Sequence, residues 1–541
     1  MFLTLKRALK EAFVKRFSQT CCVIVTCLLA LAAQAEKAQK GPVVINEIKH
    51  DVSMPLRDMA KQTPVQKHAN REIDNRPPGV VPRQVGAPGV DTAVDMGVLP
   101  TVGTTQLLNF DGQGADGVAP PDTEGSVGGN QYVQWVNLDY NVYDKTTGAL
   151  ILGPVAANAF WSGFGGVCQN NNDGDPIVLF DKLANRWFVA QNVFVSPYTT
   201  CIAISTTNDA TGTYTRYAFP ITPSSEFPDY PKWGVWPDAY FGSYRDFKNG
   251  ETFEGGVACA LDRNAILAGN TATEQCFPAG ASYDVLLPSD LDGLTPPPDG
   301  STNLYVSVGV DTTHIDSFAF HVDFTTPTNS TFTGPTHLNV VSYTLICQSP
   351  FTRTCIPQPS GGEKLDSLGG FLMYRNAYRN FGTYESNLVA HTIAPSSPST
   401  AKGAVRWYEI RGGVTAPKVF QQGTRQDNTS TANSYWLPTM AQDKDGDIAL
   451  GFSVSGVNTD PSMYYVGRLP TDKQGTMEAP KKVILGTGVQ KNTDDRWGDY
   501  ATISVDPSDD CTMWYTNEYI KTTGSFGWNT RITSFKFPGC N

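Results

Sequence analysis

Apolar and polar residues alternate in short runs over most of the chain. Residues 132–138, 177–180 and 201–205 are short runs rich in apolar, aromatic and β-branched residues, as is typical of β-strands, and turn-forming clusters separate the runs. The turns at 181–185 and 208–212 each join two such runs, which indicates hairpins. Since no segment shows the period of a long amphipathic helix, the pattern predicts an all-β fold.

A loose repeat runs through these hairpins. Units open with Asp or Glu near an aromatic residue or a proline, and continue as strand, turn and strand. The openings lie at residues 121–123, 173–176, 228–234, 384–387, 435–438 and 496–500, and a further unit covers 303–335. Seven units over residues 107–541 average about 62 residues, which fits four-stranded blades arranged radially. We therefore predict a β-propeller with seven blades, six or eight being possible, and a tandem of β-sandwiches is the alternative.

The start of the chain has the features of a secretory signal peptide. Basic residues precede an apolar run at 21–33, which ends on Ala33, Gln34 and Ala35. The run is shorter than the roughly 20 residues that span a bilayer, so we expect cleavage rather than an anchor. The prediction is a secreted protein, extracellular or periplasmic, without membrane insertion. It consists of a signal peptide (1–35), a polar segment (36–105) and a propeller domain (106–541), with residues 107–110 closing the ring. The polar segment is a linker, a pro-segment or an arm packed on the core, and its composition favours disorder.

Composition and charge narrow the possible classes of protein. Only 17% of residues are charged, and the chain has 50 Gly and 37 Pro, which excludes a coiled coil and a charged disordered chain. The net charge of −11 argues against a nucleic-acid-binding protein, which normally has a basic surface.

The cysteines after residue 35 are even in number, which favours disulfides in an exported protein. They fall into successive pairs along the chain. If each repeat closes its own bridge, the pairs are Cys168–Cys201, Cys259–Cys276, Cys347–Cys355 and Cys511–Cys540. The absence of C-x-x-C spacing among them argues against a zinc site.

Several motifs resemble a family of large exported bacterial proteins. The resemblance rests on residues 109–112, 119–123, 132–137, 161–166, 174–176, 229–234 and 496–500, and it covers most of 107–541. It implies export and an all-β repeat fold. Because this family has no settled activity, the resemblance implies no catalytic residues.

The acidic residues of the openings are the first candidates for chemistry. We expect them to converge at one mouth of the propeller: Asp122, Asp175, Asp229, Glu385 and Asp499. Clustered carboxylates raise one another's pKa, so that a protonated one can act as a general acid, or they can hold a divalent cation. Arg496 and Arg375 could bind the carboxylate of an acidic sugar. Alternatively, each Asp caps a turn inside its own blade.

Two further groups have a functional and a structural interpretation. His391 follows Tyr384 and Glu385, and a His with a Tyr can serve in β-elimination from a uronic acid, or it can simply be packed in a strand. The alternating carboxylates Asp443, Asp445 and Asp447 predict a calcium loop. This run lacks the later Glu of an EF-hand, and a hairpin turn also explains it.

The sequence thus leads to two functional hypotheses. The first is a secreted propeller that acts on or binds an extracellular polysaccharide, as a glycoside hydrolase or polysaccharide lyase. A hydrolase needs two carboxylates about 5–9 Å apart in an open mouth. The alternative is a non-catalytic binding or adhesion propeller with structural calcium. We expect a monomer in either case.

Overall fold

Antiparallel strands form almost all the regular structure, as the alternation of apolar and polar residues predicts. The computed structural model describes residues 41–62, 71–72, 79–85, 91–95, 100, 103–347, 353–395, 402–429, 433–491 and 495–541. The predicted signal peptide lies outside these residues. No described helix is long and apolar enough to cross a membrane.

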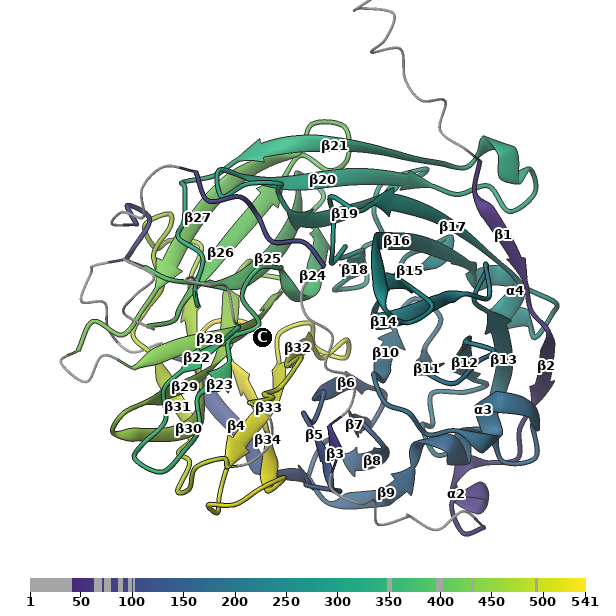
Figure 1. Cartoon of the computed structure of the whole chain (residues 1–541), viewed down its shortest axis with the longest axis horizontal. Helices are drawn as coiled ribbons and strands as arrows, with labels where there is room; N and C mark the ends of the chain where they lie inside the picture. Colours follow the sequence, from purple (N-terminus) through teal and green to yellow (C-terminus); the bar gives the residue numbers. More distant parts are fainter. Residues whose placement is uncertain are drawn as a thin grey trace, which may run out of the picture. The chain divides into compact units, whose positions relative to one another are not determined.

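The strands form seven blades around a common axis (Figure 1). Blades one to three are β6–β9 (Glu124–Gly128, Gln131–Val136, Asp139–Asp144, Leu150–Ala156), β10–β13 (Ile177–Asp181, Arg186–Val193, Thr199–Ser205, Tyr214–Pro220) and β14–β17 (Glu226–Val235, Ala239–Lys248, Thr252–Asp262, Thr273–Gly280). Blades four and five are β18–β21 (Ser289–Leu291, Asn303–Val308, His314–His321, Thr331–Asn339) and β24–β27 (Met373–Asn380, Glu385–Ile393, Ala404–Arg411, Lys418–Arg425). Blades six and seven are β28–β31 (Ser434–Gln442, Ile448–Gly456, Thr459–Arg468, Lys481–Ile484) and β32–β34 with β4 (Thr502–Val505, Met513–Ile520, Trp528–Lys536, Thr105–Gly114). The prediction of a seven-bladed propeller is confirmed.

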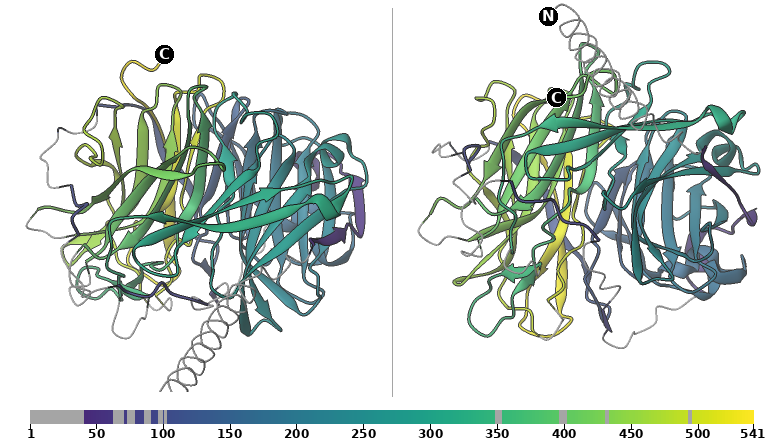
Figure 2. Two further views of the ribbon diagram at one scale, coloured as in Figure 1. Left: turned by 90° about the horizontal axis from the view of Figure 1, so that it is seen from above. Right: turned by 45° about the horizontal axis from the view of Figure 1, so that its top comes forward.

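The first strand of each blade lies at the axis. In cyclic order, β6, β10, β14, β18, β24, β28 and β32 are neighbours, and β32 returns to β6 (Figure 1). The side views of Figure 2 show the strands running through the thickness of this ring. Blade four is the least regular, because β18 pairs with β24 of the next blade while Leu287 bridges to Val306 of its own blade.

The ring is closed by two segments from opposite ends of the chain. Strand β4 pairs with β34, so that Phe110 lies opposite Ile532. The predicted closure by residues 107–110 is therefore confirmed. A strand from near the N-terminus held by the C-terminal blade makes unfolding of the ring cooperative, because neither end can separate without breaking this sheet.

Described stretches before β4 pack on the propeller. Strand β1 (Val43–Asn46) extends blade three by pairing with β17, and β2 (Lys49–Val52) extends blade two by pairing with β13. Further along, Arg406 donates a hydrogen bond of 2.5 Å from Nη2 to Asp91, and both side chains are buried. Whether residues 36–105 act as a linker or a pro-segment stays a prediction.

The remaining elements are short. They are α2 (Leu56–Met59), α3 (Gly166–Asn170), α4 (Arg263–Ala268), the 3-10 turns Ala157–Trp161 and Pro327–Asn329, and strands β3 (Arg71–Glu72), β5 (Val118–Ala119), β22 (Thr354–Ile356) and β23 (Leu365–Asp366). The core lies between blades and contains fully buried tryptophans such as Trp135, Trp187 and Trp407. Interlocked aromatic rings of this size supply much of the apolar burial that holds neighbouring blades together.

All four predicted disulfides are present. They are Cys168–Cys201, Cys259–Cys276, Cys347–Cys355 and Cys511–Cys540. The last one ties the segment after β34 to the loop before β33, within the blade that closes the ring.

Candidate functional site

Three openings of the repeat mark the turn into the innermost strand of a blade. Asp122, Asp175 and Asp499 have φ of 49°, 51° and 56° and directly precede β6, β10 and β32. Tyr230 and Leu437 have the same left-handed conformation at bulges in β14 and β28. Asp tolerates this conformation better than most side chains, which explains its recurrence at this place.

The aspartate cluster consists of Asp122, Asp175, Asp229 and Asp499, contributed by blades one, two, three and seven in that order. Asp499 and Asp175 both act electrostatically on Asp122, and Asp229 acts on Asp175, so the predicted convergence of these four is observed. Their exposed fractions are only 1%, 3%, 4% and 7% in the order given. The cluster is therefore enclosed in the protein, and these carboxylates do not line an open mouth.

Two of these carboxylates are neutralised by arginines. Asp229 accepts a hydrogen bond of 2.6 Å from Arg245 Nη1, and Arg245 also binds Asp284 at 2.6 Å. Asp499 accepts one of 2.6 Å from Arg496 Nη2. Because charges buried in protein need a partner, these pairs serve the fold, and Arg496 does not reach toward solvent for a sugar carboxylate.

The other two carboxylates have strongly shifted affinities for protons. Burial, with the charges of Asp229 and Asp499, raises the pKa of Asp175 to about 7. Burial also raises the pKa of Asp122 well above its usual range, and Asp499 and Asp175 add to the effect. Within this cluster, carboxyls whose pKa is raised thus lie beside carboxylates that are paired with arginine, which is the arrangement that acid catalysis requires.

A lysine that the sequence did not single out completes the cluster. Lys232 is fully buried, and its ammonium lies 3.4 Å from the ring centre of Tyr230 and 3.9 Å from that of Tyr500. Burial lowers its pKa to about 8, although Asp175 and the other carboxylates oppose this shift. The cation is held by aromatic faces and by the Pro231 carbonyl, to which it donates at 2.8 Å.

Three other predicted site residues lie elsewhere. Glu385 begins β25, the second strand of blade five, and its Oε1 accepts a hydrogen bond of 2.7 Å from the Tyr378 hydroxyl. His391 is fully buried further along the same strand, 3.0 Å from the Tyr408 hydroxyl, and burial lowers its pKa to about 3. Arg375 lies on the axis but binds Asp290 at 2.6 Å and Asp292 at 2.8 Å. Glu385 and His391 therefore do not join the aspartate cluster.

The run Asp443, Asp445 and Asp447 forms the turn between β28 and β29. Asp443 Oδ1 accepts hydrogen bonds of 3.0 Å from the backbone N–H groups of Asp445 and Asp447. Their carboxylate oxygens do not come within 4.8 Å of one another as a set of three. The turn interpretation accounts for the geometry, and calcium binding here stays a prediction.

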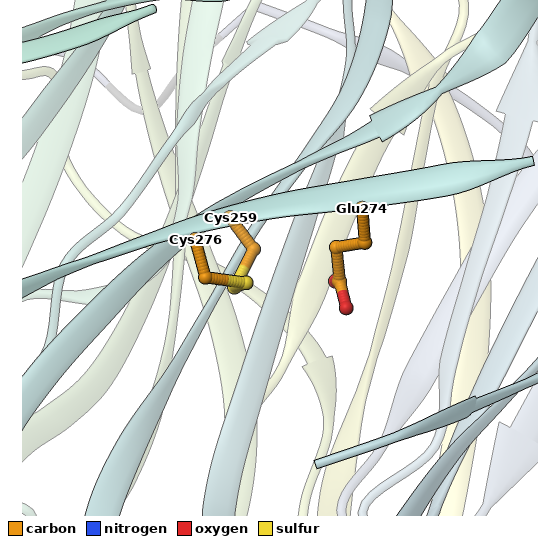
Figure 3. Close-up of side chains that lie close together, drawn as sticks. All are labelled: Cys259, Glu274 and Cys276. Carbon is orange, nitrogen blue, oxygen red and sulfur yellow. A yellow bond between two sulfur atoms is a disulfide. The ribbon is translucent and has the colours of Figure 1, made fainter. Parts of the chain in front are cut away.

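One compact group of potential ligand atoms contains Cys259, Glu274 and Cys276 (Figure 3). Both sulfurs belong to one disulfide, so they are not available as thiolate ligands. Burial raises the pKa of Glu274 to about 8. This group is a disulfide beside a buried carboxyl and not a metal centre.

An open groove lies over blade five. The blade-five groove has a volume of about 490 Å³ and is lined by Pro298, Asn380, Gly382, Thr383, Tyr384, Glu385, Arg411, Gly412, Lys418 and Phe420. The Arg411 guanidinium lies 3.8 Å from the ring centre of Tyr384 and 3.5 Å from that of Phe420. The volume is in the range of small-molecule sites, and planar groups with a few charges converge on it.

The sequence identified this groove only in part. Tyr384 and Glu385 belong to a repeat opening, but Arg411 ends β26 and Phe420 lies in β27. Only the register of these antiparallel strands brings the four residues together, and no local sequence motif predicts that register.

Comparisons with known proteins find no relative by sequence and only distant similarities by structure. No protein-family model and no curated protein sequence matches the chain. Among solved structures, a DUF4623 family protein from Bacteroides eggerthii is 8% identical, with 81% of this chain and 77% of that chain covered and a TM-score of 0.29. An α-L-arabinanase from Penicillium chrysogenum is 8% identical over 81% of this chain and 100% of its own, with a TM-score of 0.34. The N-terminal domain of Nup159 is 9% identical over 83% and 100%, with a TM-score of 0.35. At these scores the similarities carry no argument about activity.

Proposed function

We propose that this protein is an extracellular propeller that binds an acidic polysaccharide in the blade-five groove. The observation that carries the proposal is the groove itself, in which Arg411 is stacked between Tyr384 and Phe420 beside the exposed Lys418. Aromatic surfaces pack against the apolar faces of sugar rings, and arginine binds carboxylates in two-pronged geometry.

Charge supports an acidic polymer in particular. Arg411 and Lys418 are matched in number by Glu385 and by the buried Glu409, but Lys418 is the exposed one of these four charged side chains, in a chain whose net charge is −11. The guanidinium Nε of Arg411 binds Glu409 at 2.5 Å, which fixes the orientation of the planar group. An exposed ammonium next to a guanidinium of fixed orientation can bind the carboxylates of an anionic polymer.

Burial of the aspartate cluster argues against cleavage as the main function. A general acid must come within hydrogen-bond distance of the glycosidic oxygen, and carboxylates that are at most 7% exposed do not offer that access. The raised pKa of Asp175 is the observation that favours the second candidate, a glycoside hydrolase, if the polymer reaches the axis.

The experiment is a panel of neutral and acidic polysaccharides, on which the purified protein is assayed for retention and for release of reducing ends. We expect retention on acidic polymers without new reducing ends, and a strong loss of retention for Arg411→Gln. Arg57→Gln is the matched control, because Arg57 forms an exposed ion pair with Asp209 outside the groove. The proposal would be overturned if the wild type were not retained, or if Arg411→Gln were retained as well as the wild type. Release of new reducing ends would instead support the glycoside hydrolase.

A further inference from the structure

A small cavity remains on the propeller axis. It has a volume of about 20 Å³, and its charged lining residues are Glu124, Lys182, Asp290, Asp292 and Arg375. They come from the inner strands β6, β18 and β24 and from the turn after β10, so the cavity lies in the middle of the ring (Figure 1). A space of this size holds one water molecule or one small ion and excludes a sugar.

Most charges around the cavity are compensated. Asp290 and Asp292 bind Arg375, and Asp292 Oδ1 also lies 3.4 Å from the Lys182 ammonium. Glu124 is fully buried, and neither of its carboxylate oxygens has a hydrogen-bond partner or an ion pair among the described residues. Three carboxylates thus face two cations, and the lining has a net charge of −1 when all are ionised.

The nearby Lys232 acts electrostatically on Glu124 but does not pair with it. Its ammonium contacts the rings of Tyr230 and Tyr500 and the Pro231 carbonyl, and no ion pair joins it to Glu124 in the part of the chain that the structure describes. A fully buried carboxylate without a partner is costly, so it takes up either a proton or a cation.

Two hydroxyl oxygens of the same cavity lining also lack partners. Thr502 Oγ1 and Ser504 Oγ line the same cavity from β32, the neighbour of β6, and both atoms are buried without a hydrogen bond among the described residues. With the two oxygens of Glu124, four oxygen atoms are left for one occupant. Carboxylate and neutral oxygens are the ligands that hard cations prefer.

We propose that the axial cavity binds one monovalent metal cation, such as Na⁺, through Glu124, Thr502 and Ser504. The ion cancels the residual negative charge of the lining and joins β6 of the first blade to β32 of the last. It therefore stabilises the junction at which the ring closes. This proposal is independent of polysaccharide binding.

The test compares the thermal midpoint of the purified protein in NaCl and in choline chloride at equal ionic strength and pH 7.5. Choline is too large for the cavity, so the wild type should melt about 2 °C or more higher in NaCl. This difference should disappear in Glu124→Gln. In choline chloride the Glu124→Gln variant should be at least as stable as the wild type, because it lacks the uncompensated charge.

Two further variants serve as controls for the assignment of the ion to Glu124. Glu274→Gln removes another buried carboxyl, far from the residues that line the cavity, and should keep the full difference between the salts. Thr502→Val keeps the volume and the charge, and should raise the Na⁺ concentration needed for half of the shift; it provides the test if Glu124→Gln does not fold.

Equal midpoints of the wild type in both salts, or a salt difference that survives in Glu124→Gln, would overturn the proposal. A shift produced by CaCl₂ and not by NaCl would overturn the assignment of a monovalent ion.

Discussion

The aspartate cluster and the blade-five groove are two polar regions of the same propeller with opposite designs. In the cluster, carboxylates are buried and are compensated by arginines or shifted in their pKa. In the groove, the charged side chains of Arg411 and Lys418 remain accessible, and the rings of Tyr384 and Phe420 are half-buried. The first region joins inner strands to one another, and the second presents charged and aromatic side chains that are partly open to solvent.

The difference shows that residues which recur at equivalent places along the chain indicate a structural role more directly than a catalytic one. Asp122, Asp175 and Asp499 recur because three inner strands, β6, β10 and β32, follow the same left-handed turn. A binding surface needs no such recurrence, since one blade is enough to build it. The groove residues of blade five have no counterparts of the same composition at the other repeat openings.

The largest effect should come from breaking the buried network at the axis. Arg245→Met leaves Asp229 and Asp284 without the guanidinium that binds each of them at 2.6 Å. Removal of one partner from a buried ion pair costs about 3–5 kcal/mol of unfolding free energy. Guanidinium denaturation measures this loss. Arg57→Met breaks an exposed ion pair and should lose at most about 1 kcal/mol of unfolding free energy. Equal losses in the two variants would mean that the buried ion pairs of Arg245 stabilise the fold no more than an exposed pair does.

The second prediction concerns the pH dependence of stability. Asp175 has a pKa of about 7 in the folded protein against 3.8 ordinarily, so the folded state holds a proton that the unfolded state has lost. Stability is therefore full below pH 4 with respect to this group and falls as the pH rises from 4 to 7. The groups facing it are Asp122, Asp229, Asp499 and Lys232, and the lysine keeps its proton in this range.

The measurement is the denaturation midpoint of the wild type and of Asp175→Asn between pH 4 and 7. The variant should show a clearly shallower decline. Parallel curves for the two proteins would show that Asp175 is ionised throughout, and would remove the main support for the hydrolase candidate.

The third prediction concerns polysaccharide binding in the blade-five groove. Phe420→Ala removes the ring that covers one face of Arg411 at 3.5 Å. We expect affinity for the retained polysaccharide to fall about tenfold, which is 1.4 kcal/mol, while stability changes by about 1 kcal/mol because the ring is only half-buried. Isothermal titration and thermal melting of the same samples separate the two. A large loss of stability with unchanged affinity would place Phe420 with the structural residues.

The fold could be predicted from the sequence more completely than the candidate site, for physical reasons. The period of two, the repeat openings and the order of the cysteines are local signals, and they predicted the blades, the closure by β4 and all four disulfides. Convergence of Asp122, Asp175 and Asp499 followed from their equivalent places in different blades. Glu385 was grouped with them because its opening resembles theirs, yet it starts a second strand and not an inner one. Lys232, Arg411 and Glu124 were missed, because single charged residues in strands carry no signature until neighbouring strands are in register.

The smallest effect should come from the most exposed charge of the groove. Lys418 begins β27 and is open to solvent, so its contribution to anion binding is screened. Lys418→Ala should weaken polysaccharide binding by about threefold in low salt, as expected for an exposed ion pair. The matched control Lys473→Ala removes the same charge from a solvent-exposed turn in blade six, and it should bind as the wild type does. At 0.5 M NaCl, where charges more than about 4 Å apart are largely screened, the wild type and Lys418→Ala should bind equally. If Lys473→Ala lost as much affinity as Lys418→Ala, the polymer would be responding to the net charge of the protein and not to the groove.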